Sequence, residues 1–215
     1  MRWLRELLYP SRAMCLGCGS LVGQDQPWLC GACLEALETC RLSSEAVFSH
    51  ASILSACHPY RYQHPVDALV RHLKYNSVKD LAPRMAADMV RALNPLCQSA
   101  DVIVPVPMHP LRKMRRGLNH AELLARYLSE ATGIPLETSL RRSRYTPQQA
   151  RLSHEQRKHN LDNAFRATDS LQGKAVLLVD DVCTTGTTAE QCAKALLAAG
   201  ARHVCLVTYA LAAKG

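Results

Sequence analysis

Aromatic residues are scarce in this sequence, which has two Trp, two Phe and an aromatic fraction of 5%. A protein that stacks single-stranded nucleic acid on aromatic rings is expected to have more, so any contact with nucleic acid should use the phosphate backbone. Long apolar runs are also missing, since no stretch approaches the roughly 18 apolar residues that predict a membrane span. The start of the chain is too short and too interrupted by charge for a signal peptide, so we expect a cytoplasmic protein.

The remaining composition is that of a folded, basic protein. Apolar residues make up 48% and charged residues 20% of the 215 positions, which is enough for a normal core and weighs against disorder. The net charge is +8 and the pI is near 9.1, a balance that favours anionic partners such as phosphates, nucleotides or nucleic acid. The length suits one domain with a small appended module.

Four of the ten cysteines form two close pairs near the start of the chain, Cys15-x-x-Cys18 and Cys30-x-x-Cys33. Each pair can hold one side of a tetrahedral metal, and two pairs complete a closed four-cysteine site with a structural role. Zinc is the expected ion, although rubredoxin-like iron uses the same ligands. A redox dithiol is the alternative for either pair alone. The other six cysteines are scattered, as expected for buried thiols in a reducing compartment.

The pattern of apolar residues predicts an α/β fold after a small cysteine-rich module. We expect the module at residues 1–40, a linker at 41–57 and the main domain at 58–215. Strands and helices alternate with short links, which implies a parallel sheet with right-handed crossovers. The expected strands cover residues 101–106, 134–140, 174–179 and 203–209, and the expected helices cover 66–73, 79–93, 121–128 and 189–197.

The segment after the strand at 174–179 is the most informative. Asp180 and Asp181 end the strand, and a Thr-rich turn around one glycine leads directly into a helix. The N–H groups and dipole of a helix N-terminus favour phosphate, and a glycine there lets the backbone approach the ligand closely. The predicted phosphate-binding residues are Thr184, Thr185, Gly186, Thr187 and Thr188. No Gly-x-x-x-x-Gly-Lys motif is present, which excludes a P-loop of the ATPase kind. The alternative is that the acids cap a turn and that the Thr-rich turn is ordinary.

Two basic segments are candidates for holding a diphosphate. The first follows the strand at 101–106, and its predicted ligands are Arg112, Arg116, Gly117 and Asn119. The second spans residues 141–165, includes Gln149 and Arg157, and has the composition of a lid over an anionic ligand. The alternatives are a solvated run of charge for the first segment and a nonspecific basic surface for the second.

The run from Val179 to Thr188 resembles the phosphoribosyl diphosphate loop of type I phosphoribosyltransferases. The resemblance implies that Asp180 and Asp181 hold the ribose hydroxyls and that residues 184–188 bind the 5′-phosphate, with Mg²⁺ accompanying the ligand. Several members that act on purines have an Asp where this chain has Thr184, and use it as a base. The difference weighs against base-assisted chemistry on a purine.

The chain as a whole resembles the ComF group, which joins a cysteine-rich module to a phosphoribosyltransferase-like domain. The shared segments are 73–75, 104–107, 116–119 and the run from 146 to 165. Leu118 and His120 depart from the group, which more usually has Phe and Gln there. The resemblance implies a role in competence and DNA uptake, with single-stranded DNA and the competence machinery as partners.

Three functions remain open from the sequence. The first is a Mg²⁺-dependent phosphoribosyltransferase, whose acceptor and catalytic residues the sequence does not reveal. The second is an adaptor that binds phosphoribosyl diphosphate and single-stranded DNA. The third is a sensor that binds phosphoribosyl diphosphate without turnover. Thr184 in place of a carboxylate favours the last two.

Overall fold

The computed structural model describes residues 14–22, 28–42, 50–75, 81–108, 118–142, 164–168 and 171–212. The helices in these ranges are α2 (Gly31–Thr39), α3 (Val66–Tyr75), α4 (Leu81–Ala92), α5 (Pro95–Gln98), α7 (His120–Thr132) and α9 (Thr187–Ala198). The strands are β1 (Ser55–Cys57), β2 (Tyr60–Arg61), β3 (Val102–Pro105), β4 (Leu140–Arg142), β5 (Phe165–Ala167), β6 (Ala175–Cys183) and β7 (His203–Leu211).

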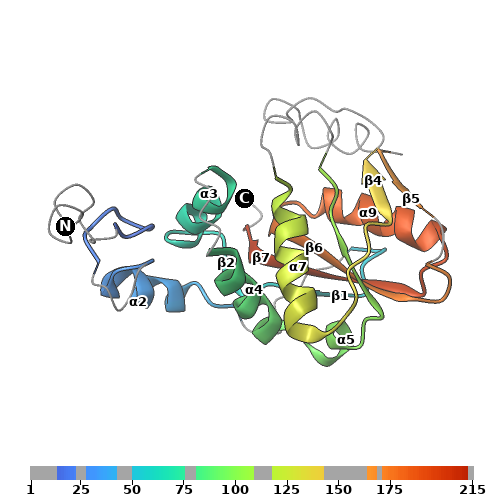
Figure 1. Ribbon diagram of the computed structural model, residues 1–215, viewed down its shortest axis with the longest axis horizontal. Helices are drawn as coiled ribbons and strands as arrows, with labels where there is room; N and C mark the ends of the chain where they lie inside the picture. The colour runs from blue at the N-terminus through green and yellow to red at the C-terminus, as the bar shows by residue number, and fades with distance from the viewer. Residues whose placement is uncertain are drawn as a thin grey trace, which may run out of the picture.

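A parallel sheet forms the centre of the molecule. Its strand order is β1-β7-β6-β3, and β2 also pairs with β7 beyond the end of β1. The predicted parallel α/β fold is therefore confirmed, with β6-α9-β7 as the crossover that carries the Thr-rich turn. In Figure 1, α2 lies at one end of the molecule and the antiparallel β4–β5 pair lies at the other.

The two faces of the sheet bury separate cores. Leu177 and Val179 of β6 pack with α3, α4 and α7, whereas Val176 and Leu178 pack with α9 and β5. Successive side chains of a strand point to opposite faces, so a strand covered on both faces reads as one continuous apolar run. This arrangement explains why residues 175–179 are apolar without alternation, and it fixes the position of the two acids that follow.

The prediction of a strand over residues 134–140 is wrong. Only Leu136 forms a parallel bridge, with Ile103 of β3, and a regular strand begins at Leu140 as part of β4. Pro135 has no N–H to donate, and two backbone bonds to Ile103 flank Leu136: the N–H of Ile103 donates to the carbonyl of Pro135, and the N–H of Glu137 donates to the carbonyl of Ile103. Residues 55–57, expected at the end of the linker, form β1 and pair with Cys205 to Val207 of β7.

Candidate functional site

The two acids lie within the carboxyl-terminal part of β6. The predicted strand at 174–179 continues to Cys183, because β7 extends to Leu211 and supplies backbone partners that far. Asp180 pairs in register with Thr208 of β7, and both acids are half-buried, unlike the fully buried residues before them. They therefore stand at the carboxyl edge of a parallel sheet, where ligands of such folds bind.

Asp180 is in a setting that disfavours its charge. Burial and the neighbouring charge of Asp181 raise its pKa from the usual value near 4 to about 7. The backbone N–H of Asp181 donates to Asp180 Oδ1 at 2.8 Å and opposes part of this rise. Without a bound ligand, the Asp180 carboxyl is therefore partly protonated near neutral pH.

Lys74 at the end of α3 partners the acids. Its Nζ lies 2.8 Å from Asp181 Oδ2, and both side chains are largely buried. Burial acts to lower the pKa of Lys74, but the charges of Asp181 and Asp180 outweigh it, so the pKa is raised. Sequence reasoning included Lys74 in a matching segment without giving it a role, because residues 74 and 181 are neighbours only in the fold.

The Thr-rich turn joins β6 to α9 with one left-handed residue. Gly186 has φ +75° and is the residue before the first turn of α9, which opens with Thr187 and Thr188. Thr184 is exposed, and the hydroxyls of Thr185 and Thr187 are 2.9 Å apart. The structure thus brings residues 180–188 together at one sheet edge and at one helix N-terminus, an arrangement suited to a sugar phosphate.

Asn119 is the one predicted diphosphate ligand within the described residues. It is buried at the start of α7, and its Nδ2 donates to the carbonyl of Val106, 3.1 Å away. This bond ties the start of α7 to the end of β3, at the same sheet edge as the acids. The other predicted diphosphate and lid residues lie outside the described ranges: Arg112, Arg116, Gly117, Gln149 and Arg157.

The four close cysteines form a compact cluster. Their sulfurs all lie within 4.8 Å of one another, and Cys18 Sγ is 3.7 Å from Cys30 Sγ. Zinc–sulfur bonds of about 2.3 Å place tetrahedral ligands about 3.8 Å apart, so the cluster fits a zinc ion held by four thiolates. A Cβ at Gly17 would lie 2.8 Å from Cys33 Sγ, which explains the glycine inside the first pair.

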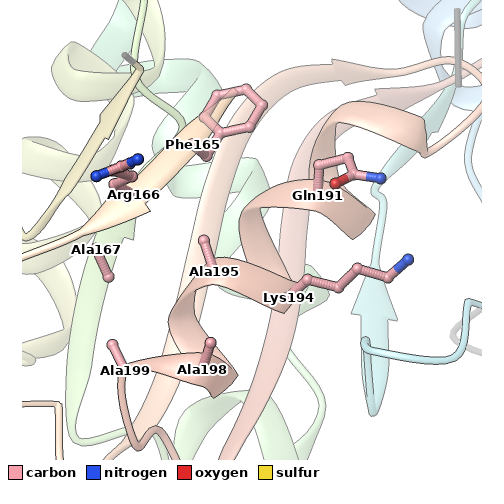
Figure 2. A pocket seen from close by; sticks show the side chains of 8 residues that line it. All are labelled: Phe165, Arg166, Ala167, Gln191, Lys194, Ala195, Ala198 and Ala199. Atoms are coloured by element: carbon pink, nitrogen blue, oxygen red, sulfur yellow. The ribbon is translucent and has the colours of Figure 1, made fainter. Parts of the chain in front are cut away.

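A hollow of about 700 Å³ lies between β5 and α9. Figure 2 shows Ala195 and Ala198 on the side of α9 that faces β5, while Lys194 points away from it. Arg166 comes from β5, and none of the acids or threonines of the turn is among the described residues that line the hollow. The geometry of the acids, and not the size of this hollow, therefore identifies the candidate site.

Known proteins resemble the chain over most of its length. A profile of the phosphoribosyl transferase domain matches residues 74–215. The DNA utilization protein YhgH of Salmonella typhimurium is 36% identical over 149 residues, which are 66% of this chain and 66% of that protein. Competence protein F of Haemophilus influenzae is 33% identical over 157 residues, 71% of this chain and 64% of that protein. These relatives confirm the predicted resemblance to the ComF group, and each match spans about two thirds of the relative's length.

Solved structures show a more distant likeness. A glutamine phosphoribosylpyrophosphate amidotransferase from B. subtilis is 25% identical with a TM-score of 0.42, covering 65% of this chain and 30% of that chain. A purine phosphoribosyltransferase from Pyrococcus horikoshii is 20% identical with a TM-score of 0.39, covering 60% and 70%. At these TM-scores the likeness places no residue of the site. Within the described ranges, no helix is both long and apolar enough to cross a membrane.

Proposed function

Because the chain belongs to the phosphoribosyltransferase domain family, we propose that it binds phosphoribosyl diphosphate at the carboxyl end of β6 and acts in DNA uptake. The observation that carries the proposal is the meeting of Asp180 and Asp181 with the left-handed turn at Gly186 and the start of α9. Carboxylates accept hydrogen bonds from vicinal ribose hydroxyls, and the free N–H groups of the first helical turn suit a 5′-phosphate.

Each part of the ligand then has its own set of residues. Asp180 and Asp181 hold the ribose, and residues 184–188 hold the 5′-phosphate. The proposed ligands of the diphosphate are Arg112, Arg116 and the segment with Gln149 and Arg157, which the sequence alone suggests. Bound Mg²⁺ would neutralise charge on the diphosphate oxygens. Lys74 keeps the Asp181 carboxylate in place from α3, since its Nζ is 2.8 Å from that group.

Single-stranded DNA is the proposed macromolecular partner, in the cytoplasm and with the competence machinery. The net charge of +8 supports backbone contact, and the relatives named for competence and for DNA utilization support the biological setting. A fluorescence titration with a labelled oligonucleotide at increasing salt tests this part. Contact with phosphates predicts that the logarithm of the binding constant falls linearly with the logarithm of salt concentration. Absence of binding at low salt would contradict the DNA part and leave the ligand site untouched.

An active phosphoribosyltransferase is the second candidate, and an assay for released diphosphate separates it from binding alone. The exposed Thr184 provides no carboxylate at the position where purine-specific enzymes have a base, which supports binding without purine transfer. Purified protein should therefore bind phosphoribosyl diphosphate and Mg²⁺ and release no diphosphate when purine bases are offered. Release with any nitrogen nucleophile would instead establish the transferase and identify the acceptor.

A further inference from the structure

A short segment before β1 contacts the phosphate-binding turn, although the two lie far apart in the sequence. Residues 50–53 form a tight turn closed by a bridge between His50 and Ile53. The next residue, Leu54, donates its N–H to the carbonyl of Val204 at 2.8 Å, and Ile53 is buried in the core that includes Ala189 of α9. These contacts place His50 beside the start of α9, although about 136 positions separate it from Gly186 in the sequence.

The imidazole of His50 lies directly against Gly186. A Cβ added at Gly186 would overlap His50 Nε2 and lie 2.9 Å from two ring carbons. The ring therefore occupies the space that a side chain at position 186 would need. Gly186 has φ +75°, so both its backbone conformation and its close neighbour require glycine. The His50 ring thus packs on the residue whose conformation gives the phosphate-binding turn its shape.

Glu190 in the first turn of α9 holds the segment in this position. Its carboxylate accepts the hydroxyl of Ser52 at 2.8 Å and the backbone N–H of Ser52 at 3.2 Å. The same carboxylate lies 3.8 Å from His50 Nδ1 and 3.8 Å from Lys194 Nζ. The Glu190 side chain is 13% exposed and that of His50 is 20% exposed, so water screens these contacts less than it would at the surface.

We propose that His50 is a positioning residue of the phosphate site, which holds the turn at Gly186 in the conformation that accepts a 5′-phosphate. The inference rests on the proposed function and adds the segment before β1 to the ligand site. A turn already held in its bound shape loses less conformational entropy when the ligand binds, so affinity increases. The effect should be largest for ligands that carry the sugar phosphate, because the ring of His50 packs on Gly186 within the turn proposed to hold that phosphate.

Calorimetric titration of the full-length protein with three ligands tests the proposal. The ligands are Mg²⁺-phosphoribosyl diphosphate, ribose 5-phosphate and inorganic diphosphate with Mg²⁺. In His50→Ala the dissociation constants of the first two should rise about tenfold, because the turn at Gly186 must then be ordered when the ligand binds. The constant for diphosphate should stay within about twofold of the wild type, which is the usual error of additivity between independent sites.

Two further variants separate positioning from damage to the fold. His50→Gln keeps a polar side chain of similar reach against Gly186 and should recover at least half of the lost binding free energy. His203→Ala removes a histidine at the start of β7, which pairs with Ala175 at the opposite end of the sheet, and should leave all three constants unchanged. If His50→Ala is unstable, His50→Gln is measured alone. Its dissociation constants for the two sugar phosphates should be moderately higher than those of the wild type, and its constant for inorganic diphosphate should not change.

The outcomes distinguish the two proposals. Failure of the wild type to bind either sugar phosphate would overturn the proposed function, and the role of His50 with it. Wild-type binding with unchanged constants in His50→Ala would overturn the role of His50 alone. An equal loss for inorganic diphosphate would also overturn it, because the residue would then support the whole site and not the phosphate turn.

Discussion

At the scale of single residues, Asp180 is placed where its negative charge costs stability. Its carboxyl is half-buried beside Asp181, and its pKa is raised to about 7. The folded protein therefore binds a proton there that the unfolded chain, with a carboxyl pKa near 4, has already released. Stability from this group is greatest below about pH 4 and falls as the pH rises to about 7, above which the loss is complete. In the complex proposed above, the ribose hydroxyls would donate hydrogen bonds to this charge.

Asp180→Asn should stabilise the protein at pH 8 while it abolishes affinity for the sugar ligand. The amide keeps an oxygen that accepts the Asp181 N–H, but it carries no charge. We expect a gain of at least about 1 kcal/mol, since one pKa unit corresponds to about 1.4 kcal/mol. This is a rise of roughly 2–4 °C in the unfolding temperature. Thermal melts at pH 4.5 and pH 8 measure it, and the gain should be smaller at pH 4.5.

Glu35→Gln is the matched control, because it neutralises an exposed carboxylate on α2. Its unfolding temperature should follow the wild type at both pH values, as for most surface substitutions. An Asp180→Asn protein that is less stable than the wild type at pH 8 would contradict the conclusion that the charge of Asp180 destabilises the folded protein.

At the scale of elements, local sequence predicted β6, the turn and α9 because each depends on neighbours in the chain. An apolar run, a glycine in a left-handed turn and a helical repeat are all signals within a short window. The prediction was wrong at 134–140, where the proline leaves a single bridge to β3. It also missed His50, Lys74 and Glu190, since a spacing rule cannot relate segments that only the folded chain brings together. The pattern of apolar residues along the chain does not show that the end of α3 lies next to Asp181.

Lys74→Met tests the link between α3 and β6. The substitution keeps the aliphatic length but leaves Asp181 without its 2.8 Å partner in a largely buried site. Removing one member of a buried pair costs about 3–5 kcal/mol, and the partial exposure here reduces the expected loss to roughly 1–3 kcal/mol. Urea unfolding should show a larger loss at pH 8 than at pH 5, because Asp180 is mostly protonated at the lower pH.

Arg71→Met on the same helix is the control for that loss. Arg71 pairs with Asp67 across one turn of α3, and its side chain is 63% exposed. Surface pairs of this kind contribute less than about 1 kcal/mol, so the variant should differ little from the wild type. Equal losses in the two variants would show that Lys74 makes no special contact with the acids.

At the scale of the whole molecule, the cysteine module is joined to the sheet domain by backbone contacts. The N–H of Arg61 donates to the carbonyl of Cys40, and the N–H of Leu42 donates to the carbonyl of Pro59. Cys33 Sγ also lies 3.8 Å from His64 Nε2, just before α3. The module therefore lies against the residues that precede α3, the helix whose Lys74 pairs with Asp181.

Purified protein should contain about one zinc per chain, held by the four clustered cysteines. Cys18→Ser should lose most of the metal and lower the unfolding temperature, because a closed site of four thiolates contributes to folding. Elemental analysis with thermal melts measures both, and Cys192→Ser, a buried thiol of α9, should keep the full metal content. Iron in place of zinc, visible by its absorption, would correct the metal, and absence of any metal would contradict the cluster's proposed role.

Calorimetric titration of the wild type and of Asp180→Ala/Asp181→Ala tests the proposal that the carboxyl end of β6 binds phosphoribosyl diphosphate. The wild type should show saturable, Mg²⁺-dependent binding of about one ligand per chain, and the double variant should lose it. Equal binding by both proteins, or none by a folded wild type, would contradict it.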